Sequence, residues 1–425
     1  MKKLSLNNNL ISKIKGIFFP FYKSKEALKI FDTLEKDQPK NKKVAMFVGG
    51  CVRKYILGEQ IDDIDLATIY NPEEIKEKFE GTEIKVIDTG IEHGSVTLLL
   101  NGHKFEITTL RKDIKTDGRH AEVSFTDDWQ LDSERRDFTI NAIYLDRKGK
   151  IFDPQLGTKD LKNNIVKFIG DPDKRIKEDY LRIIRFIRFS LQYESKTTEE
   201  STLEAIKLNL DGVNYLSKER ILDELLKIIK LKNFKNILKN KELHTIFSLI
   251  FPEFKNINRI NKMDLLSNKE FLKFDNGVIL ASLTIDDSNN HEYFCHKYKT
   301  SNYIRNKMDV LAETFKKYKL DKNFLTKNLN KNIYFLGKQT VKDFILFIFL
   351  QNKKLTLNEL LKLINKVEKA SIPKFPYDGQ YLINKGFKEG KKIGLILKEL
   401  EKQWVNNNYY LSDKNIASII EKTKV

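Results

Sequence analysis

The first part of the chain alternates short apolar runs with turns, whereas the second part carries long stretches of helical periodicity. Residues 24–36 space their apolar side chains as one face of a helix does, which predicts an amphipathic helix. Val44–Val48 has the pattern of a short buried strand, and Gly49-Gly50 and a helix-like segment, Cys51–Leu57, follow it. This order predicts a strand that turns sharply into a helix.

Short strands and turns continue from about residue 61 to residue 152. Asn101-Gly102 joins two of these strands and is a strong hairpin signal. Beyond residue 171 the pattern is helical to the end of the chain. Strands followed by helices predict an α+β fold, with a mixed β-sheet in a head and helices in the remainder. The expected strands are Ile64–Ile69, Glu83–Val86, Ser95–Leu100, Lys104–Leu110 and Ala142–Leu145.

Composition adds a strong positive charge to this picture. The 425 residues include 77 Lys and Arg against 59 Asp and Glu, a formal net charge of +18. Such an excess suits a polyanionic partner, because cations that neutralise phosphates release counterions. A general bias toward Lys and Asn explains the excess equally well, so composition leaves both interpretations open. No run of about 18 uncharged apolar residues is present, and two cysteines cannot form a disulfide framework, so we expect a cytoplasmic protein without a membrane partner.

The glycine turn and two nearby aspartates form the first candidate site. Gly49 and Gly50 bring backbone N–H groups at a helix start close to an anion, and Arg53 can add a bidentate phosphate contact. On a strand, Asp63 and Asp65 project from the same face and repel each other unless a cation lies between them. Mg²⁺ suits this position because it combines one or two carboxylates with substrate phosphates. A tight turn is the ordinary alternative for the glycines, and a solvated strand edge is the ordinary alternative for the aspartates. Because both motifs occur in one strand–turn–helix–strand unit, we favour binding of phosphate and metal.

Two further groups extend this site along the chain. Glu106, on an apolar strand, is a candidate third carboxylate, and a surface position is an equal alternative. Arg136 and Asp137, with Asn141 four residues later, suit a triphosphate and a ribose hydroxyl. A charge network at the N-terminus of a helix is the alternative for this second group.

The most specific cluster lies at residues 178–188. At helical spacing, Asp179 and Arg182 are i,i+3 neighbours, and Arg185 and Arg188 continue the same stripe. Salt bridges within the helix are the ordinary interpretation, but they leave two arginines without acidic partners nearby in sequence. A carboxylate and a guanidinium on a rigid helix can instead pair with the edge of cytosine or adenine. Guanine and uracil have a carbonyl where cytosine and adenine have the exocyclic amine. The carboxylate would then face another acceptor, which leaves buried polar groups unpaired.

Taken in order, these motifs resemble those of class II CCA-adding tRNA nucleotidyltransferases, a superfamily that also contains bacterial poly(A) polymerases. The resemblance covers residues 25–195 and implies a polymerase-β-like nucleotidyltransferase head. It implies a head at residues 1–165 that includes the N-terminal helix, a neck at 166–240 with the base-recognition helix, a body at 241–350 and a tRNA-binding tail at 351–425.

The resemblance also implies a role for each motif. CTP and ATP would be the substrates, two Mg²⁺ ions the cofactors, and tRNA the partner that lies along the basic body. The residues it marks are Asp63 and Asp65 for metal binding and catalysis, Gly49, Gly50 and Arg53 for the triphosphate, Arg136, Asp137 and Asn141 for phosphate and ribose, Asp179 and Arg182 for the base, and Arg185 and Arg188 for further nucleotide contacts.

The predicted activity is therefore addition of C, C and A to the 3′ end of tRNA. Poly(A) addition, addition of A alone or of CC alone, and a non-catalytic RNA-binding role remain alternatives. Tyr180-Leu181, where the polymerases have Pro-Val, favours CCA addition. Lys54 departs from the Asp that the family has there, and Arg111–His120 falls where the family has a flexible loop.

Overall fold

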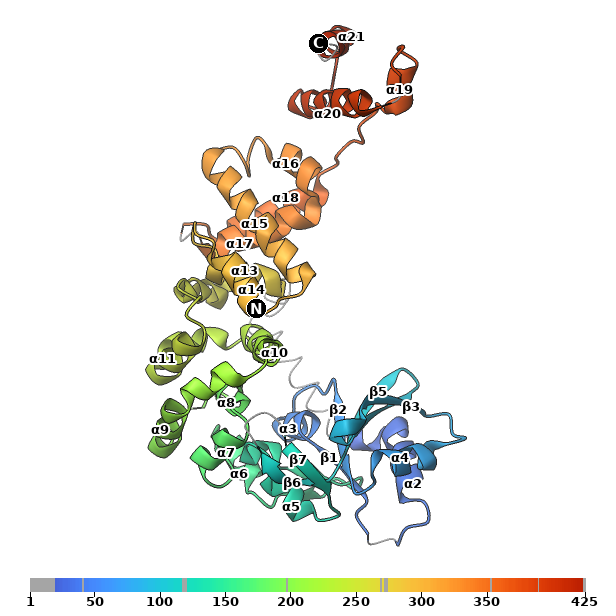
Figure 1. The fold of residues 1–425 in the computed structure, drawn as a ribbon, viewed down its shortest axis with the longest axis vertical. Helices are drawn as coiled ribbons and strands as arrows, with labels where there is room; N and C mark the ends of the chain where they lie inside the picture. The colour runs from blue at the N-terminus through green and yellow to red at the C-terminus, as the bar shows by residue number, and fades with distance from the viewer. Residues whose placement is uncertain are drawn as a thin grey trace. The chain divides into compact units, whose positions relative to one another are not determined.

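The structure is a computed structural model, and it divides into two compact units between Pro252 and Glu253 (Figure 1). The four-part division at residues 165, 240 and 350 stays a prediction. The structure describes residues 20–39, 42–116, 121–195, 198–267, 270, 274–351, 354–388 and 390–422.

The first unit is built on a seven-stranded mixed sheet, which confirms the predicted α+β fold. Of the strand pairs described, β2–β5 is parallel and the others are antiparallel. In the strand order, β2 lies at the centre of the sheet, between β1 and β5. The strand order is β3 (Lys85–Gly90), β4 (Ser95–Leu100), β5 (His103–Thr109), β2 (Ile64–Thr68), β1 (Ala45–Val48), β8 (Tyr144–Leu145) and β9 (Ile151–Phe152).

The predicted strand–turn–helix is present at β1. All four residues of β1 are buried, and α3 (Gly50–Leu57) begins directly after Gly49. The helix α2 (Lys25–Glu35) buries its apolar face against β1, where the rings of Phe31 and Phe47 lie 4.9 Å apart. The amphipathic helix expected at residues 24–36 is thus confirmed, and its packing fixes the strand that leads into the turn.

The predicted strands agree with the structure to different degrees. Ser95–Leu100 is confirmed to the residue as β4. The expected strand Ala142–Leu145 shortens to β8, because the 3₁₀ helix η3 (Thr139–Asn141) occupies the preceding residues. The loop expected at Arg111–His120 is wrong in its first part, since β6 (Arg111–Thr116) pairs with β7 (Ala121–Phe125). Residues 117–120 lie outside the described residues.

Helices complete the first unit, and an aromatic cluster joins one of them to the sheet region. Phe138 and Phe168 form an isolated β-bridge with ring centroids 4.8 Å apart. Phe186, on α8, stacks on Phe168 at 5.8 Å, and Phe189 meets Phe138 at 5.5 Å. These helices are α4 (Pro72–Phe79), α5 (Trp129–Glu134), α6 (Gly157–Lys162), α7 (Pro172–Glu178), α8 (Leu181–Gln192), α9 (Glu200–Leu208), α10 (Lys218–Ile229) and α11 (Lys241–Ile250).

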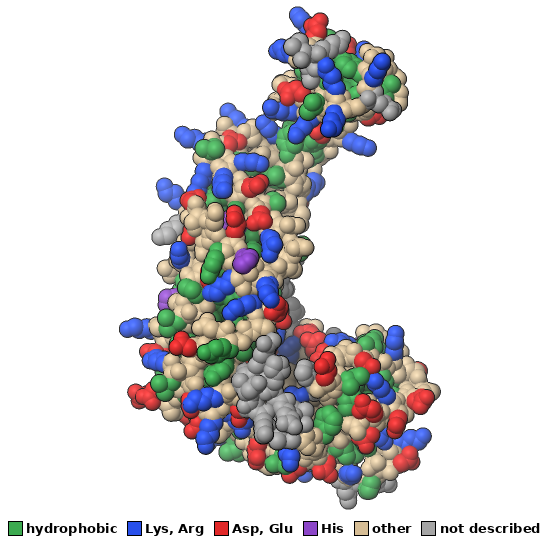
Figure 2. Space-filling model, in the orientation of Figure 1, with side chains coloured by type: hydrophobic (Ala, Val, Ile, Leu, Met, Phe, Trp, Pro, Cys, Tyr) green, Lys and Arg blue, Asp and Glu red, His purple; other side chains and the backbone are tan. Residues whose placement is uncertain are grey.

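The second unit is helical throughout its described residues, as predicted. Its last three helices share their own apolar core, which includes Leu382, Leu400 and Trp404. Lys and Arg side chains are spread over the visible face of this unit rather than gathered in one patch (Figure 2). No described helix is long and apolar enough to cross a membrane. The helices are η6 (Ile257–Leu265), α13 (Asn276–Thr284), α14 (Asn290–Lys297), α15 (Asn302–Leu320), α16 (Leu329–Leu336), α17 (Lys338–Gln351), α18 (Leu357–Lys369), α19 (Gly379–Ile383), α20 (Lys391–Asn406) and α21 (Asp413–Lys422).

Candidate active site

The turn between β1 and α3 brings the glycines against Asp65. Gly49 has a φ of 74°, and a Cβ atom there would lie 3.1 Å from Oδ2 of Asp65. The backbone N–H of Gly50 donates to the Asp65 carboxylate. A Cβ atom at Gly50 would meet no atom within 4 Å, so the start of α3 faces open space. Gly49 is therefore needed for backbone conformation and close approach, while Gly50 leaves room for an anion at the helix start.

Three carboxylates lie on neighbouring strands beside this turn. Asp65 pairs with Glu106 in the parallel register of β2 and β5, so their side chains share one face. Asp63 directly precedes β2, rather than lying within it as expected, and its side chain is exposed. Burial and then the charge of Glu106 raise the pKa of Asp65, although Arg53 and the Gly50 N–H oppose the shift. The carboxylates thus destabilise one another's charge, which favours binding of a cation.

The carboxylates fit Mg²⁺ better than a metal that needs an all-protein cage. Among the described residues, no group of three or more His, Cys, Asp or Glu side chains is arranged to hold a metal ion by itself. Mg²⁺ commonly keeps several waters and takes one or two carboxylates together with substrate phosphates. Asp63 and Asp65 beside an open helix start supply that partial set of ligands, and a triphosphate would complete it.

Arg53 links three parts of the sequence that were expected to form one site. Its side chain is buried, its Nε donates to the Tyr193 hydroxyl at 2.7 Å, and its guanidinium also donates to Oδ1 of Asn141. Asn141 in turn donates to Asp137 at 2.6 Å. The predicted phosphate and ribose residues therefore lie together, and Tyr193 at the end of α8 is a partner that the sequence did not indicate.

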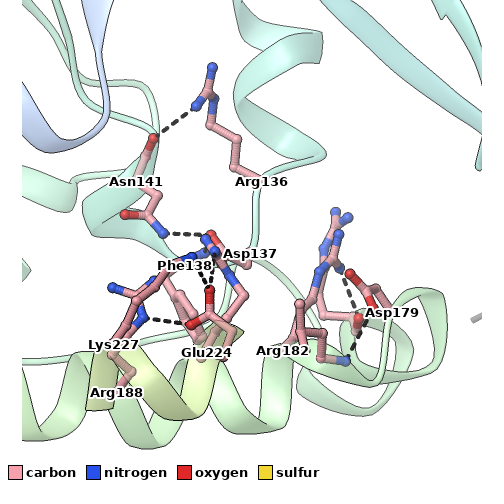
Figure 3. Close-up of polar contacts among 12 residues, drawn as sticks. Arg136, Asp137, Phe138, Asn141, Asp179, Arg182, Arg188, Glu224 and Lys227 are labelled. Atoms are coloured by element: carbon pink, nitrogen blue, oxygen red, sulfur yellow. Dashed lines mark hydrogen bonds and ion pairs between the residues drawn. The ribbon is translucent and has the colours of Figure 1, made fainter. Parts of the chain in front are cut away.

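Asp137 and Glu224 connect this group to α8 and α10 (Figure 3). Arg185 donates to Asp137 at 2.7 Å, and Arg188 donates to Glu224 at 2.6 Å. Burial alone would raise the pKa of Asp137, but the charge of Arg185 and the hydrogen bond from Asn141 lower it to about 2. Arg185 and Arg188, which have no acidic partner nearby in sequence, therefore pair with carboxylates from distant parts of the chain. Glu224 was missed because nothing close to it in sequence indicates a site.

Arg136 is held by a buried carboxylate that sequence reasoning also missed. Asp132, on α5, is fully buried and accepts from Arg136 at 2.9 Å and from Arg135 at 2.7 Å. The hydroxyl of Tyr144 donates to the same carboxylate at 2.7 Å. A charge network is thus present, but at the C-terminal end of α5 rather than at the helix N-terminus that the alternative required. The i,i+3 and i,i+4 spacing from Asp132 to the arginines was the available sequence signal.

The continuous helix expected through Asp179 and Arg182 is wrong. Asp179 has an extended backbone (φ −157°) between α7 and α8, and its Oδ1 accepts the N–H of Leu181 at 3.1 Å. An aspartate that bonds the backbone ahead of it competes with helix continuation and starts a new helix. Its Oδ2 accepts from Arg220 on α10 at 2.7 Å, so its ionic partner is not Arg182.

Arg182 is fixed separately, on the neighbouring turn of α8. Its guanidinium donates to Glu178 and to the backbone carbonyls of Arg175 (2.8 Å) and Arg135 (3.2 Å). Each member of the predicted base-reading pair therefore has its own anchors. The apolar residues Ile184 and Ile187 are fully buried on the opposite face, as predicted.

Lys54, the departure from the expected family pattern, turns toward the acidic segment. Its Nζ lies 2.8 Å from Oδ2 of Asp62, the residue before Asp63. Both side chains are partly exposed, so the pair contributes little to stability. Its position ties the end of α3 to the residues that lead into β2.

Comparison with known proteins identifies relatives along nearly the whole chain. The model of the Poly A polymerase head domain matches residues 45–167, and that of the probable RNA and SrmB-binding site of polymerase A matches residues 197–258. The human mitochondrial CCA tRNA nucleotidyltransferase 1 is 36% identical over 88% of this chain and 86% of its own length. The CCA-adding enzyme of Ligilactobacillus salivarius is 34% identical over 89% and 92%, respectively.

A similar fold is found among solved structures. The crystal structure of the Bacillus stearothermophilus CCA-adding enzyme in complex with CTP has a TM-score of 0.73 to this chain. The two share 23% sequence identity, over 94% of this chain and 97% of that one.

Replacing Glu224 with Ala should strongly destabilise the first unit. The change leaves the largely buried Arg188 without its carboxylate partner, which costs about 3–5 kcal/mol. Thermal unfolding followed by circular dichroism measures the loss. Asp223→Ala, an exposed neighbour on the same helix, is the matched control and should change stability little. Equal melting of the two variants would contradict the role of Glu224.

Acid should weaken the fold through Asp137. Because its pKa is lowered from 3.8 to about 2 in the folded chain, its ionised form stabilises the fold above about pH 4. This contribution, about 2 kcal/mol, is lost as the pH falls through about 2. The free energy of unfolding of Asp137→Asn should therefore depend less on pH between 5 and 2 than that of the natural chain. Parallel curves for the two proteins would rule this out.

Proposed function

The chain belongs to the CCA-adding tRNA nucleotidyltransferase family, and we propose that it adds C, C and A in turn to the 3′ end of tRNA from CTP and ATP. One observation supports the assignment of the nucleotide-binding site in this chain. Three segments far apart in sequence meet in a continuous polar chain, in which Arg53 bonds Asn141, Asn141 bonds Asp137 and Asp137 bonds Arg185. This series of hydrogen bonds lies next to the glycine turn, since Arg53 is near the start of α3.

Asp63, Asp65 and Glu106 form an acidic face, and this face is proposed as the place of phosphoryl transfer. Asp63 and Asp65 would hold Mg²⁺, with Glu106 as a third carboxylate. Mg²⁺ held there would lower the pKa of the terminal 3′-hydroxyl and neutralise charge on the phosphates. The 3′-hydroxyl releases its proton to solvent and its oxygen forms a bond to the α-phosphorus. The bond from that phosphorus to the bridging oxygen breaks, and pyrophosphate leaves with the electron pair.

The basic side chains would position the nucleotide for this attack. The open start of α3 at Gly50 and the guanidiniums of Arg53 and Arg136 suit the triphosphate, and Asn141 and Asp137 suit the ribose. These groups are already fixed by hydrogen bonds within the protein. Fixed donors need little rearrangement when charge develops, which is how positioning contributes to catalysis.

Asp179 and Arg182 are proposed to read the base. The carboxylate of Asp179 accepts from the exocyclic amine of cytosine or adenine, and Arg182 donates to the ring acceptors. Because Arg220 and Glu178 hold these two side chains separately, the pair is oriented before the nucleotide arrives. Arg185 and Arg188 order α8, and Arg185, whose side chain is 29% exposed, also reaches the nucleotide.

We also propose that the enzyme works in the cytoplasm. Its two cysteines, Cys51 and Cys295, are free and buried, as suits a reducing compartment. Several relatives carry mitochondrial names, so fractionation of the cells that make this protein decides between the two locations.

The activity is tested with a tRNA transcript that ends at the discriminator base. Incubation with Mg²⁺ and labelled CTP or ATP, singly and together, should add three nucleotides only when both triphosphates are present. A long ladder of A would instead indicate poly(A) polymerase, and addition of A alone or of CC alone would indicate a partial enzyme. Binding of the transcript without any addition would indicate a non-catalytic RNA-binding protein.

Asp63→Ala and Asp65→Asn should each reduce nucleotide transfer about a thousandfold or more, because the metal loses an essential ligand. Binding of tRNA, measured by gel shift, should remain within about twofold of the natural chain, since the carboxylates contribute no attraction to a polyanion. Asp223→Asn serves as the control for loss of an exposed carboxylate elsewhere. Full transfer activity in Asp65→Asn would refute the assignment of the metal site.

A further inference from the structure

A lysine shares the acidic face with the three carboxylates. Lys104 lies two residues before Glu106 on β5, so both side chains project from the same face of the strand. Its Nζ lies 2.5 Å from Oε1 of Glu106. The parallel register pairs Ile64 with Phe105 and Asp65 with Glu106. The pairing begins at Ile64, and Asp63 directly precedes it, within range of electrostatic interaction with Lys104. Three carboxylates and one ammonium group thus form one charged arrangement at this end of β2 and β5.

Lys104 supplies a positive charge to this arrangement. Its ammonium group pairs with the Glu106 carboxylate. Arg53, whose charge also acts on Asp65, and Lys54 make their hydrogen bonds to other residues. Arg53 bonds Tyr193 and Asn141, and Lys54 bonds Asp62. Lys104 therefore neutralises part of the charge that would otherwise attract a metal ion.

We propose that Lys104 competes with the divalent cation for this acidic face, so that metal binds weakly until a nucleotide arrives with it. The inference rests on the proposed function, because it takes the metal to lie at Asp63 and Asp65. A cation bound there sits close to the ammonium group and is repelled by it. A triphosphate adds negative charge that offsets this repulsion and gives Lys104 another acceptor. Metal uptake is thereby coupled to nucleotide uptake.

Binding of Mn²⁺ to the full-length protein without nucleotide tests the proposal. Free Mn²⁺ is followed by its electron paramagnetic resonance signal during titration, which needs no enzyme activity. Lys104→Met keeps the length of the side chain and removes its charge, so it should tighten Mn²⁺ binding about fivefold to tenfold at low salt. The gain should shrink as ionic strength rises, because the Lys104 side chain is 55% exposed and its charge is screened.

Two matched variants isolate the charge. Lys104→Arg retains it and should bind Mn²⁺ as the natural chain does. Lys150→Met removes an exposed lysine next to β9, at the edge of the sheet four strands away from β5, and should have no effect. With saturating CTP and no tRNA, the difference between Lys104→Met and the natural chain should become smaller. Unchanged or weaker Mn²⁺ binding by Lys104→Met at low salt would overturn the proposal.

Asp65→Asn separates this inference from the function on which it rests. If Asp65→Asn removes Mn²⁺ binding while Lys104→Met changes nothing, the metal site stands and the competition by Lys104 fails. If Asp65→Asn leaves Mn²⁺ binding unchanged, the assigned metal site itself fails.

Discussion

The arrangement of the first unit depends on buried ion pairs between arginines and carboxylates that are distant in sequence. Arg185 meets Asp137 across 48 positions, and Arg188 meets Glu224 across 36. A buried charge is costly unless it is paired and hydrogen-bonded. The sheet-side segment at Asp137, the helix α8 and the helix α10 must therefore assemble in one arrangement, because any other leaves a charge buried and unpaired.

This constraint also prepares the site for its substrate. Arg53, Arg136 and Arg182 are each anchored by groups of the protein, to Asn141, Asp132 and Glu178 respectively. A long arginine side chain that is free in solution loses much rotamer freedom on binding a ligand. Anchored guanidiniums have lost that freedom already during folding. The positions suited to phosphate, ribose and base are thus defined in the chain itself before a nucleotide binds.

The acidic face is built on the opposite principle. Asp63, Glu106 and Lys104 are exposed, and only Asp65 is partly withdrawn from water beneath the glycine turn. Exposed side chains can rearrange when metal and triphosphate arrive, at little cost in folding energy. Arginines paired with carboxylates inside the first unit add nothing to the net charge of +18. The Lys and Arg side chains spread over the visible face of the helical unit remain available to a polyanion (Figure 2).

The sequence by itself determined the α+β fold and the strand–turn–helix at Gly49, because these follow from local periodicity and turn chemistry. It also indicated which arginines matter. Only the tertiary structure decided what holds Arg188 and Arg53, since Glu224 and Tyr193 become their partners through folding rather than through spacing. The break in the helix at Asp179 also depends on tertiary structure. The short-range pattern predicts one helix, but the Asp179 side chain accepts from the backbone N–H of Leu181 and from Arg220 on another helix. Contacts between residues far apart in the chain leave no periodic trace in the sequence.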